Sequence, residues 1–509
     1  ISIIRASIMC IVSIISKMFN IKIKKFTSIA ISIIILLIYN PFCIFNISFL
    51  FSYLAVIGIM IYQLEIYSFL DVVLKKALKY KYIEKSKTKK YIYAVLKSVN
   101  TILSVYIAVQ ILVLPLQIYY FSKISLVSIL SNVVIYPLLN AICFIGFYIL
   151  FLSFIPFVSI ILLNCEYILL NLVIQIADLI SNISLNIVLP KPSLLILLIY
   201  YLVLVLFRLR KKAVLIVVKS KVNKLRKAVD LLFICYIIYV FVFYINILYF
   251  ESYIYFFNVE QGNMAFIRYK RKNILIDYGS TTKNLASNIL SNFCKEKGIK
   301  KIDLCILTHM HEDHVSGVFN DIKEIRIDRI LYSYPKEDID YFRELKELAN
   351  NQKISMLETD IFDSYQFDDL EIIVLSPSNN EKIMSKDIQN ANSQVILISI
   401  DDFNLLFMGD ATIETEKSII EKIKNIKDND LKSKIESKLQ KLQIIQIGHH
   451  GSKTSTSKEF LSYINVKYAI ISSKKEKFGH PHEETLEKLK QYNILFYITE
   501  YNGAIKFLI

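Results

Sequence analysis

The chain has 509 residues, of which 54% are hydrophobic, a composition too apolar for a single soluble globule. Its length leaves room for two or three domains. The formal net charge of +16 is unevenly spread: residues 1–250 hold 25 Lys and Arg against 6 Asp and Glu, whereas residues 251–509 hold 35 against 38. The basic excess therefore belongs to the apolar half, where it indicates membrane topology rather than a general nucleic-acid-binding patch.

Residues 1–250 contain repeated apolar stretches close to the ~20 residues that a helix needs to cross a bilayer. They predict seven transmembrane helices, at residues 29–45, 47–64, 98–118, 124–150, 157–180, 194–207 and 229–249. Residues 69–78 predict a short amphipathic helix along the membrane interface. A buried helix of a large soluble core is the alternative for any single stretch, but seven in succession disfavour it. We expect a polytopic α-helical membrane domain.

Basic residues gather in three segments of this half, residues 17–25, 75–97 and 208–227. The positive-inside tendency places all three segments in the cytoplasm. With these three segments in the cytoplasm, the last predicted transmembrane helix starts on the cytoplasmic side after residues 208–227. It crosses the membrane once and ends outside near Tyr249. The sequence therefore predicts a multi-pass protein of the cytoplasmic membrane whose residues 251–509 lie on the outer face.

Prolines in or beside the apolar stretches predict interrupted helices, at Pro41, Pro115, Pro137, Pro156 and Pro190. Breaks at membrane depth are tolerated where the freed backbone is buried in protein or lines a water-filled cavity. The prolines therefore favour a membrane domain with a path through it.

From Glu251 onward, short apolar strands alternate with helices, which predicts an α/β domain. Strands are expected at 253–259, 264–269, 273–277, 303–307, 328–333, 371–375, 394–400, 404–408, 443–447, 468–472, 494–498 and 504–508. Helices are expected at 283–297, 338–351, 413–425, 457–463 and 483–491. Residues 422–441 are of mixed charge without a clear apolar face, which predicts a solvated helical insertion.

Three short runs hold all seven histidines of the chain. The first, residues 308–314, follows a predicted strand and contains His309, His311, Asp313 and His314. We expect the next helix to open at residues 316–317, so that this run forms a loop whose side chains can turn toward one point. Imidazole suits zinc and manganese, and a mixed imidazole and carboxylate set can hold two divalent ions. A surface loop that happens to be rich in histidine is the alternative.

The other two runs are Ile-Gly-His-His-Gly-Ser-Lys at 447–453 and Gly-His-Pro-His at 479–482, while Asp410 follows an apolar strand in Phe-Met-Gly-Asp at 407–410. The order His-x-His-x-Asp-His, Gly-Asp, His-His-Gly-Ser and Gly-His-Pro resembles the metallo-β-lactamase superfamily. The last two motifs narrow the resemblance to the branch at the C-terminus of the ComEC family, the bacterial DNA-uptake channels.

The membrane half also resembles that family, at residues 2–6, 40–41, 48–56, 114–121 and 131–138. The resemblance covers nearly the whole chain and implies an αββα metallo-β-lactamase-like domain at residues 251–509 after a channel domain at residues 1–250. The family's N-terminal helices and OB-like domain have no counterpart, so we interpret the chain as N-terminally truncated relative to the family.

The resemblance implies two divalent metal ions, zinc or manganese. The implied ligands of the first ion are His309, His311 and either His449 or His450; those of the second are Asp313, His314 and His480, with Asp410 bridging both. The expected catalytic groups are Asp313, His480 and Lys453. Lys453 could neutralise charge that develops on a phosphate, and an ordinary surface lysine is its alternative.

The chain departs from the family at residues 258–263, Asn-Val-Glu-Gln-Gly-Asn, where the family usually has Asp-Val-Gly-Gln-Gly-Asp. Two carboxylates that could support the metal ligands or contact substrate are lost there, and Phe478 replaces a usual tyrosine. Residues 277–279 (Asp-Tyr-Gly) and 390–393 (Asn-Ala-Asn-Ser) keep the family pattern. Because every candidate ligand remains, we expect a metal-competent site.

The resemblance implies a channel that takes up single-stranded DNA in natural transformation, with an outward-facing metal-dependent nuclease that degrades the non-imported strand. One alternative is a channel with a degenerate, structural metal domain, which the changed residues 258–263 favour. The other is a membrane-anchored phosphodiesterase acting on another outer-surface substrate. The implied partners are DNA, the lipid bilayer, a DNA receptor and other competence proteins, and a homo-oligomer is compatible. An ATPase is also expected, because the chain has no Gly-x-x-x-x-Gly-Lys-Ser/Thr loop.

Overall fold

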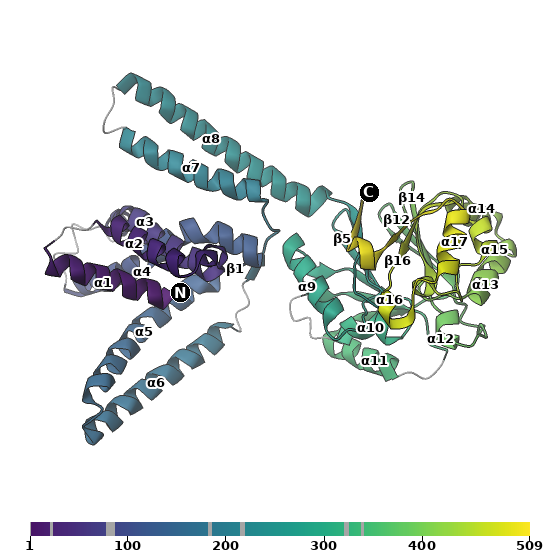
Figure 1. Ribbon diagram of the computed structural model, residues 1–509, viewed down its shortest axis with the longest axis horizontal. Helices are drawn as coiled ribbons and strands as arrows, with labels where there is room; N and C mark the ends of the chain where they lie inside the picture. Colours follow the sequence, from purple (N-terminus) through teal and green to yellow (C-terminus); the bar gives the residue numbers. More distant parts are fainter. Residues whose placement is uncertain are drawn as a thin grey trace. The chain divides into compact units, whose positions relative to one another are not determined.

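A computed structural model of the chain describes residues 2–20, 24–77, 87–181, 186–213, 219–319, 325–336 and 340–509. The chain separates into two compact units, Ile1–Leu206 and Phe207–Ile509 (Figure 1). The predicted domain boundary after residue 250 stays a prediction; a π-helical turn at Asn246–Phe250 stands there, before strand β3 (Tyr253–Phe256).

The first half of the chain is almost entirely helical. Its helices are α1 (Ser2–Met18), α2 (Lys25–Tyr39), α3 (Ile47–Ala77), α4 (Lys87–Phe121), α5 (Val127–Leu152), α6 (Pro156–Ser181), α7 (Leu194–Ala213) and α8 (Lys219–Ile245). A 3₁₀ turn at Pro41–Phe45 and two short antiparallel strands, β1 (Lys123–Ser125) and β2 (Asn186–Val188), complete the described part.

Four described helices are long and apolar enough to cross a membrane: Ile47–Ala77, Lys90–Phe121, Ser131–Leu152 and Pro156–Ile180. The other three predicted spans fall on shorter apolar helices, at Phe26–Tyr39, Leu194–Leu209 and Asp230–Ile245. Residues 69–77 of the interfacial helix predicted at 69–78 are not a short helix of their own, because no proline or glycine stops α3 there and it continues to Ala77. Their position along the membrane interface stays a prediction, and residue 78 lies outside the described residues. The basic segments behind the predicted orientation lie partly outside the described residues.

Two of the prolines that predicted interruptions, Pro115 in α4 and Pro137 in α5, lie inside continuous helices. Pro115 has no N–H, so the carbonyl of Ile111 loses its helical donor. The hydroxyl of Tyr200, on α7, donates to that carbonyl at 2.6 Å, and Tyr201 donates to the carbonyl of Leu112 at 2.8 Å. Tyr200 therefore satisfies the carbonyl that the proline frees, Tyr201 bonds the next carbonyl, and α4 continues without a break.

Replacing Tyr200 by phenylalanine should lower the stability of the membrane unit by about 1 kcal/mol, because the carbonyl of Ile111 would be left without a donor. The measurement is the melting temperature of the detergent-solubilised chain. Tyr239→Phe on α8, where the tyrosine is 42% exposed, is the matched control. A Tyr200→Phe variant that melts with the control would contradict this account of the proline.

The second half of the chain folds into two seven-stranded sheets. The first has the order β10 (Ser355–Glu358), β9 (Arg329–Tyr332), β7 (Leu304–Leu307), β5 (Lys272–Ile276), β4 (Ala265–Tyr269), β3 and β18 (Ile505–Leu508). The second has the order β11 (Ser364–Phe367), β12 (Leu370–Ser376), β13 (Val395–Ile400), β14 (Phe403–Phe407), β15 (Leu442–Gln446), β16 (Val466–Ile471) and β17 (Leu495–Ile498). Strands β6 (Lys301–Ile302) and β8 (Arg326–Ile327) form a separate parallel pair.

Helices cover the outer face of each sheet (Figure 1). Those packed on the first sheet are α9 (Leu285–Lys297), α10 (Glu312–Phe319) and α11 (Asp340–Gln352). Those packed on the second are α13 (Ile413–Lys424), α14 (Asn429–Leu439), α15 (Lys458–Tyr463) and α17 (Glu483–Gln491). Short helical turns lie at α12 (Ile388–Ala391), Gly448–Gly451, α16 (Lys475–Phe478) and α18 (Thr499–Asn502).

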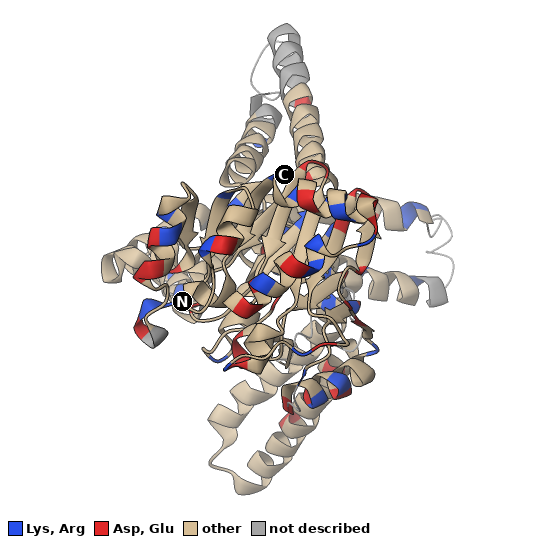
Figure 2. Ribbon diagram, turned by 90° about the vertical axis from the view of Figure 1, so that its right-hand side faces the viewer, with Lys and Arg blue, Asp and Glu red and all other residues tan. Residues whose placement is uncertain are grey.

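The alternation of side chains along each strand builds these layers. On β4, Phe266 packs toward α9 against Leu290 and Phe293, whereas Ile267 faces the other sheet with Ile372 and its neighbours. Strands buried on both faces read as unbroken apolar runs. The result is the predicted αββα sandwich, with charges of both signs mixed over its surface (Figure 2).

Residues 422–441 are not the predicted solvated insertion. They form the end of α13 and then α14, and Ile435 and Leu439 are fully buried against the second sheet. The apolar residues recur every four positions, which is a helical face that the many lysines obscured. Lys434 and Lys438 on the same helix both bind the carboxylate of Glu371, on β12, and hold the helix to the sheet.

Burial raises the pKa of Glu371, but the two lysines outweigh it and bring that pKa below its ordinary value of 4.5. A carboxyl group whose pKa is lowered by folding stabilises the protein above its unfolded pKa, and this stabilisation is lost as the pH falls through its folded pKa. Glu371→Gln should therefore weaken the docking of α14 by about 1 kcal/mol at pH 7. Hydrogen exchange of the α14 amides should be faster in Glu371→Gln than in the wild-type chain at pH 7, with little difference below pH 4. An equal difference at the two pH values would contradict the role of the Glu371 charge.

Candidate metal centre

The run at residues 308–314 is only partly the predicted loop, because helix α10 begins at Glu312 rather than at residues 316–317. The carbonyl of His311 accepts the first helical hydrogen bonds, from the N–H groups of His314 and Val315. Glu312 and Asp313 lie in the first turn, where the helix dipole favours negative charge. Asp313 and His314 are therefore held by a helix, while His309 and His311 precede it.

A tight turn after β5 fixes the start of α10. The N–H of Tyr278 donates to the carbonyl of His314 at 2.7 Å. Gly279 lies so close to the helix that a Cβ there would stand 2.2 Å from the carbonyl carbon of Asp313. Only glycine fits this approach, and the approach places the side chain of Asp277 against His314.

The carboxylate of Asp410, just after β14, lies at the centre of the histidines. Its Oδ1 is 3.1 Å from Nε2 of His314 and 3.7 Å from Nε2 of His450, and its Oδ2 is 3.9 Å from Nε2 of His309. The Oδ2 atom of Asp313 lies 3.2 Å from Nε2 of His450. Among the described residues, two groups of ligand atoms gather within 4.8 Å, namely His309, His314 and Asp410, and Asp313, His314 and His450.

The inward-facing atoms of this cluster suit a metal centre. Nε2 of His314, Oδ1 of Asp410 and Nε2 of His450 are buried, yet none makes a well-aligned hydrogen bond within the described part of the chain. Ligand atoms about 2.0–2.2 Å from an ion stand roughly 3–4 Å apart, as these do. Imidazole nitrogens mixed with carboxylate oxygens fit zinc or manganese.

The outward-facing nitrogens of these histidines are held by hydrogen bonds. Nδ1 of His314 lies 2.7 Å from Oδ2 of Asp277, and Nδ1 of His450 lies 2.7 Å from the carbonyl oxygen of Ser472. Each acceptor keeps the proton on Nδ1, so that Nε2 turns its lone pair toward Asp410.

Charges within the cluster shift one another's pKa. Burial lowers the pKa of His314, but the carboxylates of Asp410 and Asp277 outweigh it and raise that pKa well above its ordinary value. Burial raises the pKa of Asp410, but His314 and His450 hold it well below its ordinary value. Burial, followed by His450 and His449, lowers the pKa of His480 to about 4. The buried carboxylates of this cluster thus favour protonated histidines. A divalent cation that binds the same ligand atoms displaces those protons.

The remaining predicted ligands lie beside this cluster. Nδ1 of His311 is 3.0 Å from Nε2 of His309. His449 uses both ring nitrogens within the protein: Nε2 lies 3.2 Å from the side-chain amide of Asn390, and Nδ1 lies 2.8 Å from the hydroxyl of Thr454. The ring of His480 is centred 5.8 Å from that of His449 and 6.3 Å from that of His450.

Lys453 is placed differently from the candidate ligands. Its side chain is exposed, and its backbone N–H donates to Nδ1 of His482 at 3.3 Å. The structure thus brings together His309, His311, Asp313, His314, Asp410 and His450, with His449 and His480 adjoining and Lys453 at the rim.

Asp277 is a candidate site residue that the sequence patterns did not single out, although the Asp-Tyr-Gly pattern at residues 277–279 is retained. Besides His314, its carboxylate accepts hydrogen bonds from the N–H and the hydroxyl of Thr308, at 2.8 and 2.9 Å. Strands β5 and β7 are parallel, and Ile276 pairs with Ile306. A signal was present, because a carboxylate directly after β5 must lie beside the histidine run directly after β7.

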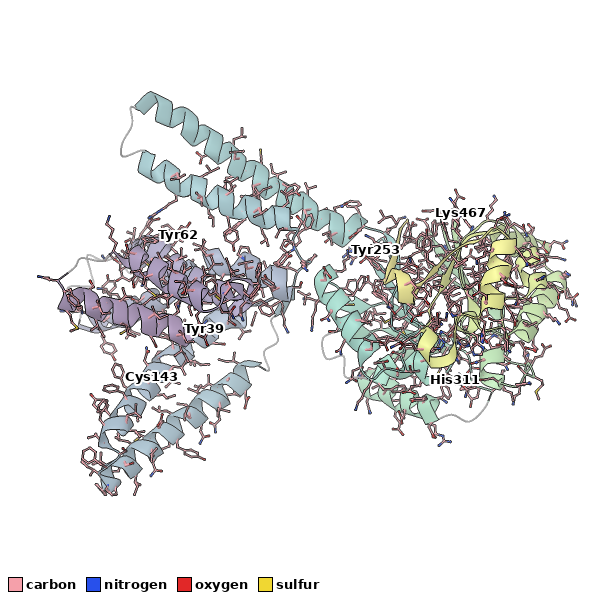
Figure 3. All side chains as sticks on the ribbon, viewed as in Figure 1. Tyr39, Tyr62, Cys143, Tyr253, His311 and Lys467 are labelled. Carbon is pink, nitrogen blue, oxygen red and sulfur yellow. The ribbon has the colours of Figure 1, made fainter. Side chains whose placement is uncertain are left out.

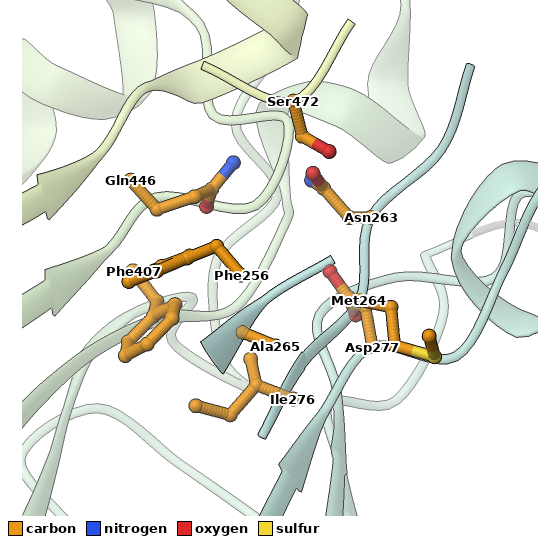
Figure 4. Close-up of a pocket in the computed structure, with 9 residues that line it drawn as sticks. All are labelled: Phe256, Asn263, Met264, Ala265, Ile276, Asp277, Phe407, Gln446 and Ser472. Atoms are coloured by element: carbon orange, nitrogen blue, oxygen red, sulfur yellow. The ribbon is translucent and has the colours of Figure 1, made fainter. Parts of the chain in front are cut away.

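The changed residues 258–263 support the site through their backbone. The N–H of Asn263 donates to the carbonyl of Asp313 at 2.9 Å, and the carbonyl of Asn263 accepts from Gly279. Its side chain lies buried between the sheets and is directed into a small space with Ser472 and Gln446, with Asp277 at the edge (Figure 4). Neither of these backbone hydrogen bonds needs a carboxylate at position 263. The carboxylate that holds His314 belongs to a different residue, Asp277, which the chain retains.

Comparison with known proteins decides the family. Residues 1–213 match the family model described as "Competence protein", and residues 257–473 match the model described as "Metallo-beta-lactamase superfamily". The chain therefore joins a competence-family domain to a metallo-β-lactamase-superfamily domain. It is 25% identical to "ComE operon protein 3" of Bacillus subtilis over 99% of its own length and 61% of that protein. The chain thus spans about three fifths of the length of this curated relative.

Two other similarities cover parts of the chain. It is 24% identical to "Competence protein ComA" of Neisseria gonorrhoeae over 48% of its length and 31% of that protein. Among solved structures, the metallo-β-lactamase fold protein YhfI of Bacillus subtilis covers 51% of this chain and all of its own, with 10% identity and a TM-score of 0.34.

Proposed function

We propose that the metallo-β-lactamase domain of this chain is a metal-dependent phosphodiesterase that holds two divalent ions. His309 and His311 would hold the first ion, Asp313, His314 and His450 would hold the second, and Asp410 would serve both. His450 thus takes the place at the second ion that the resemblance implies for His480, because its Nε2 lies 3.2 Å from Oδ2 of Asp313. The observation that carries this proposal is the position of the Asp410 carboxylate, within 3.9 Å of three histidine Nε2 atoms. His450 takes the ligand role in preference to His449, because its Nε2 lies 3.2 Å from Asp313 and 3.7 Å from Asp410. Among the described residues, His449 belongs to neither group of gathered ligand atoms.

Two divalent ions held by these residues would lower the pKa of a bound water toward neutrality and would stabilise the charge that develops on the oxygens of a phosphodiester. The chain's own residues orient the site. Asp277 and the carbonyl of Ser472 keep the ligand nitrogens of His314 and His450 pointing inward. Gly279 packs against the backbone of Asp313, and the N–H of Asn263 donates to its carbonyl, so the two residues fix the position of Asp313 at the start of α10.

The substrate of this phosphodiesterase is DNA in our proposal, and the helical half is a channel for one strand of it. Membership of the competence family and four apolar helices long enough to cross a membrane support a multi-pass protein that handles DNA. With the metal domain on the outer face, the nuclease degrades the strand that is not imported while the other strand passes inward. A DNA receptor, an ATPase and further competence proteins complete the machinery.

The degenerate-domain alternative loses its main support in the structure. That alternative rests on the missing carboxylates at residues 258–263, whereas Asp277 holds His314 and the backbone of Asn263 holds Asp313. A domain with these supports keeps what a working metal centre requires of its surroundings.

The test combines DNA uptake by competent cells with nuclease assays on the purified full chain carrying His311→Asn. We expect both DNA uptake and hydrolysis to fall, since His311 is a ligand of the first ion. Uptake that persists after hydrolysis is lost would contradict the coupling of the two activities and favour a structural metal domain. A wild-type chain that hydrolyses diesters without supporting uptake would indicate the membrane-anchored phosphodiesterase instead.

A further inference from the structure

A narrow pocket adjoins the metal centre at His309. Its walls are residues 308–310 after β7, residues 333–336 after β9, and Gln389 and Asn392 around α12. Strands β7 and β9 are parallel, and Leu307 pairs with Tyr332, so the residues that follow the two strands lie side by side. A molecule bound in this pocket would therefore lie next to the ligands of the first ion.

Two polar atoms in the pocket wall lack partners. The hydroxyl of Ser333, whose residue is only 6% exposed, and Oε1 of Gln389 make no hydrogen bond within the described part of the chain. Asn392 differs, because its side-chain amide bonds the carbonyls of Ile383 and Ile388 and its Oδ1 accepts from the N–H of Ile383. Buried groups without partners indicate that a ligand or water completes them.

Lys336 supplies positive charge at this pocket. Its ammonium donates to the carbonyl of Asn379 at 2.9 Å, and an ammonium carries three donors, so two remain for a ligand. Burial lowers its pKa below the ordinary value, against the opposing effect of Asp360 and Glu358. A partly buried cation beside a metal centre suits a phosphate group.

Tyr334 supplies an aromatic surface at the same pocket. The residue is 48% exposed, and its ring packs edge-on against Phe342 with centroids 5.4 Å apart. The ammonium of Lys346 lies 5.5 Å from the same centroid. An exposed ring in a fixed position next to a phosphate-binding group can stack a base that is free of its complementary strand.

We propose that the nucleotide next to the cleaved bond of a single DNA strand lies over the mouth of this pocket: Lys336 holds its phosphate, and Tyr334 stacks its base. The inference rests on the proposed phosphodiesterase and adds to it a preference for single-stranded substrate. The phosphate that is cleaved stays with the metal ligands. The neighbouring nucleotide, which a small diester lacks, is recognised by these pocket residues.

The test uses the full chain in detergent with Mn²⁺, two substrates, and the variants Lys336→Gln and Tyr334→Leu. For a thymidine tetranucleotide we expect KM to rise about tenfold in each variant with kcat little changed, the effect of one lost charge contact or one lost base stack. For bis(p-nitrophenyl) phosphate, which has no neighbouring nucleotide, both constants should stay at the wild-type values.

The matched controls are Lys467→Gln and Tyr501→Leu, which change exposed residues elsewhere in the α/β unit. Lys467 also lies near a tyrosine ring, at 5.2 Å from that of Tyr468, and Figure 3 shows it well away from His311. Variants of Lys336 and Tyr334 that match these controls on the tetranucleotide, or that impair both substrates equally, would overturn the proposal.

A second measurement needs no activity. In metal-depleted protein, the tetranucleotide should protect Lys336 but not Lys467 from reductive methylation followed by mass spectrometry. If the wild-type chain hydrolyses neither substrate, the phosphodiesterase proposal fails, whereas the protection of Lys336 still decides whether the pocket binds a nucleotide. Equal labelling of Lys336 with and without the tetranucleotide would overturn the pocket assignment.

Discussion

Replacing Asp410 by asparagine should reduce hydrolysis of both DNA and bis(p-nitrophenyl) phosphate by about 1,000-fold, the rate equivalent of several kcal/mol of lost charge stabilisation. The aspartate faces His314 and His450 with one oxygen and His309 with the other. An amide of the same size is neutral and offers a single oxygen, so it cannot serve two ions. The measurement is kcat/KM of the purified full chain with Mn²⁺.

Asp402→Asn is the matched control for that variant. Asp402 is an exposed residue immediately before β14, at the opposite end of the strand from Asp410. The control should keep wild-type activity, and circular dichroism should show both variants folded. An Asp410→Asn chain that retains activity within about tenfold of the control would remove Asp410 from the centre of the mechanism.

Replacing Asp277 by asparagine should reduce activity and metal affinity by about 10- to 100-fold, although Asp277 is not a ligand. One oxygen of the asparagine can still accept from Thr308, but its NH₂ group would then face Nδ1 of His314 and donate to it. His314 would carry its proton on Nε2 instead, and the lone pair directed toward Asp410 would be lost. The effect is thus a change of tautomer, not the loss of a ligand.

The measurement for Asp277→Asn is the dissociation constant for Mn²⁺ by isothermal titration, together with kcat/KM. Asp303→Asn is the control, because Asp303 also accepts a backbone hydrogen bond, from Asn273 at 2.9 Å, before the same strand β7. Equal metal affinity in the two variants would show that His314 does not depend on Asp277 for its orientation.

Most strands of the α/β domain could be predicted because apolar runs between turn residues are a local property of the sequence, whereas the αββα layering was implied by the resemblance to the metallo-β-lactamase superfamily. The start of α10 could not be predicted in this way. The helix was expected to open at residues 316–317, but it begins at Glu312, within a run that resembles a loop. The apolar face of α14 was hidden among lysines, and it depends on the contact of Ile435 and Leu439 with a sheet built from distant strands.

The local sequence also does not show whether His449 or His450 faces the candidate metal centre, because this depends on contacts with distant segments. His449 and His450 both have left-handed backbone angles, with φ of 48° and 54°, and this turn sends their rings to different partners. His450 meets Ser472 and Asp313, whereas His449 meets Asn390 and Thr454. These partners come from segments up to 137 residues away, at Asp313, so the sequence left both histidines open.

The most direct test of the central claim is to locate Mn²⁺ by anomalous scattering in crystals of the full chain. We expect two peaks about 3.5–4 Å apart on either side of Asp410, one beside His309 and His311 and the other beside Asp313, His314 and His450. A single ion bound through His449 and His480, or no ion at Asp410, would contradict the account.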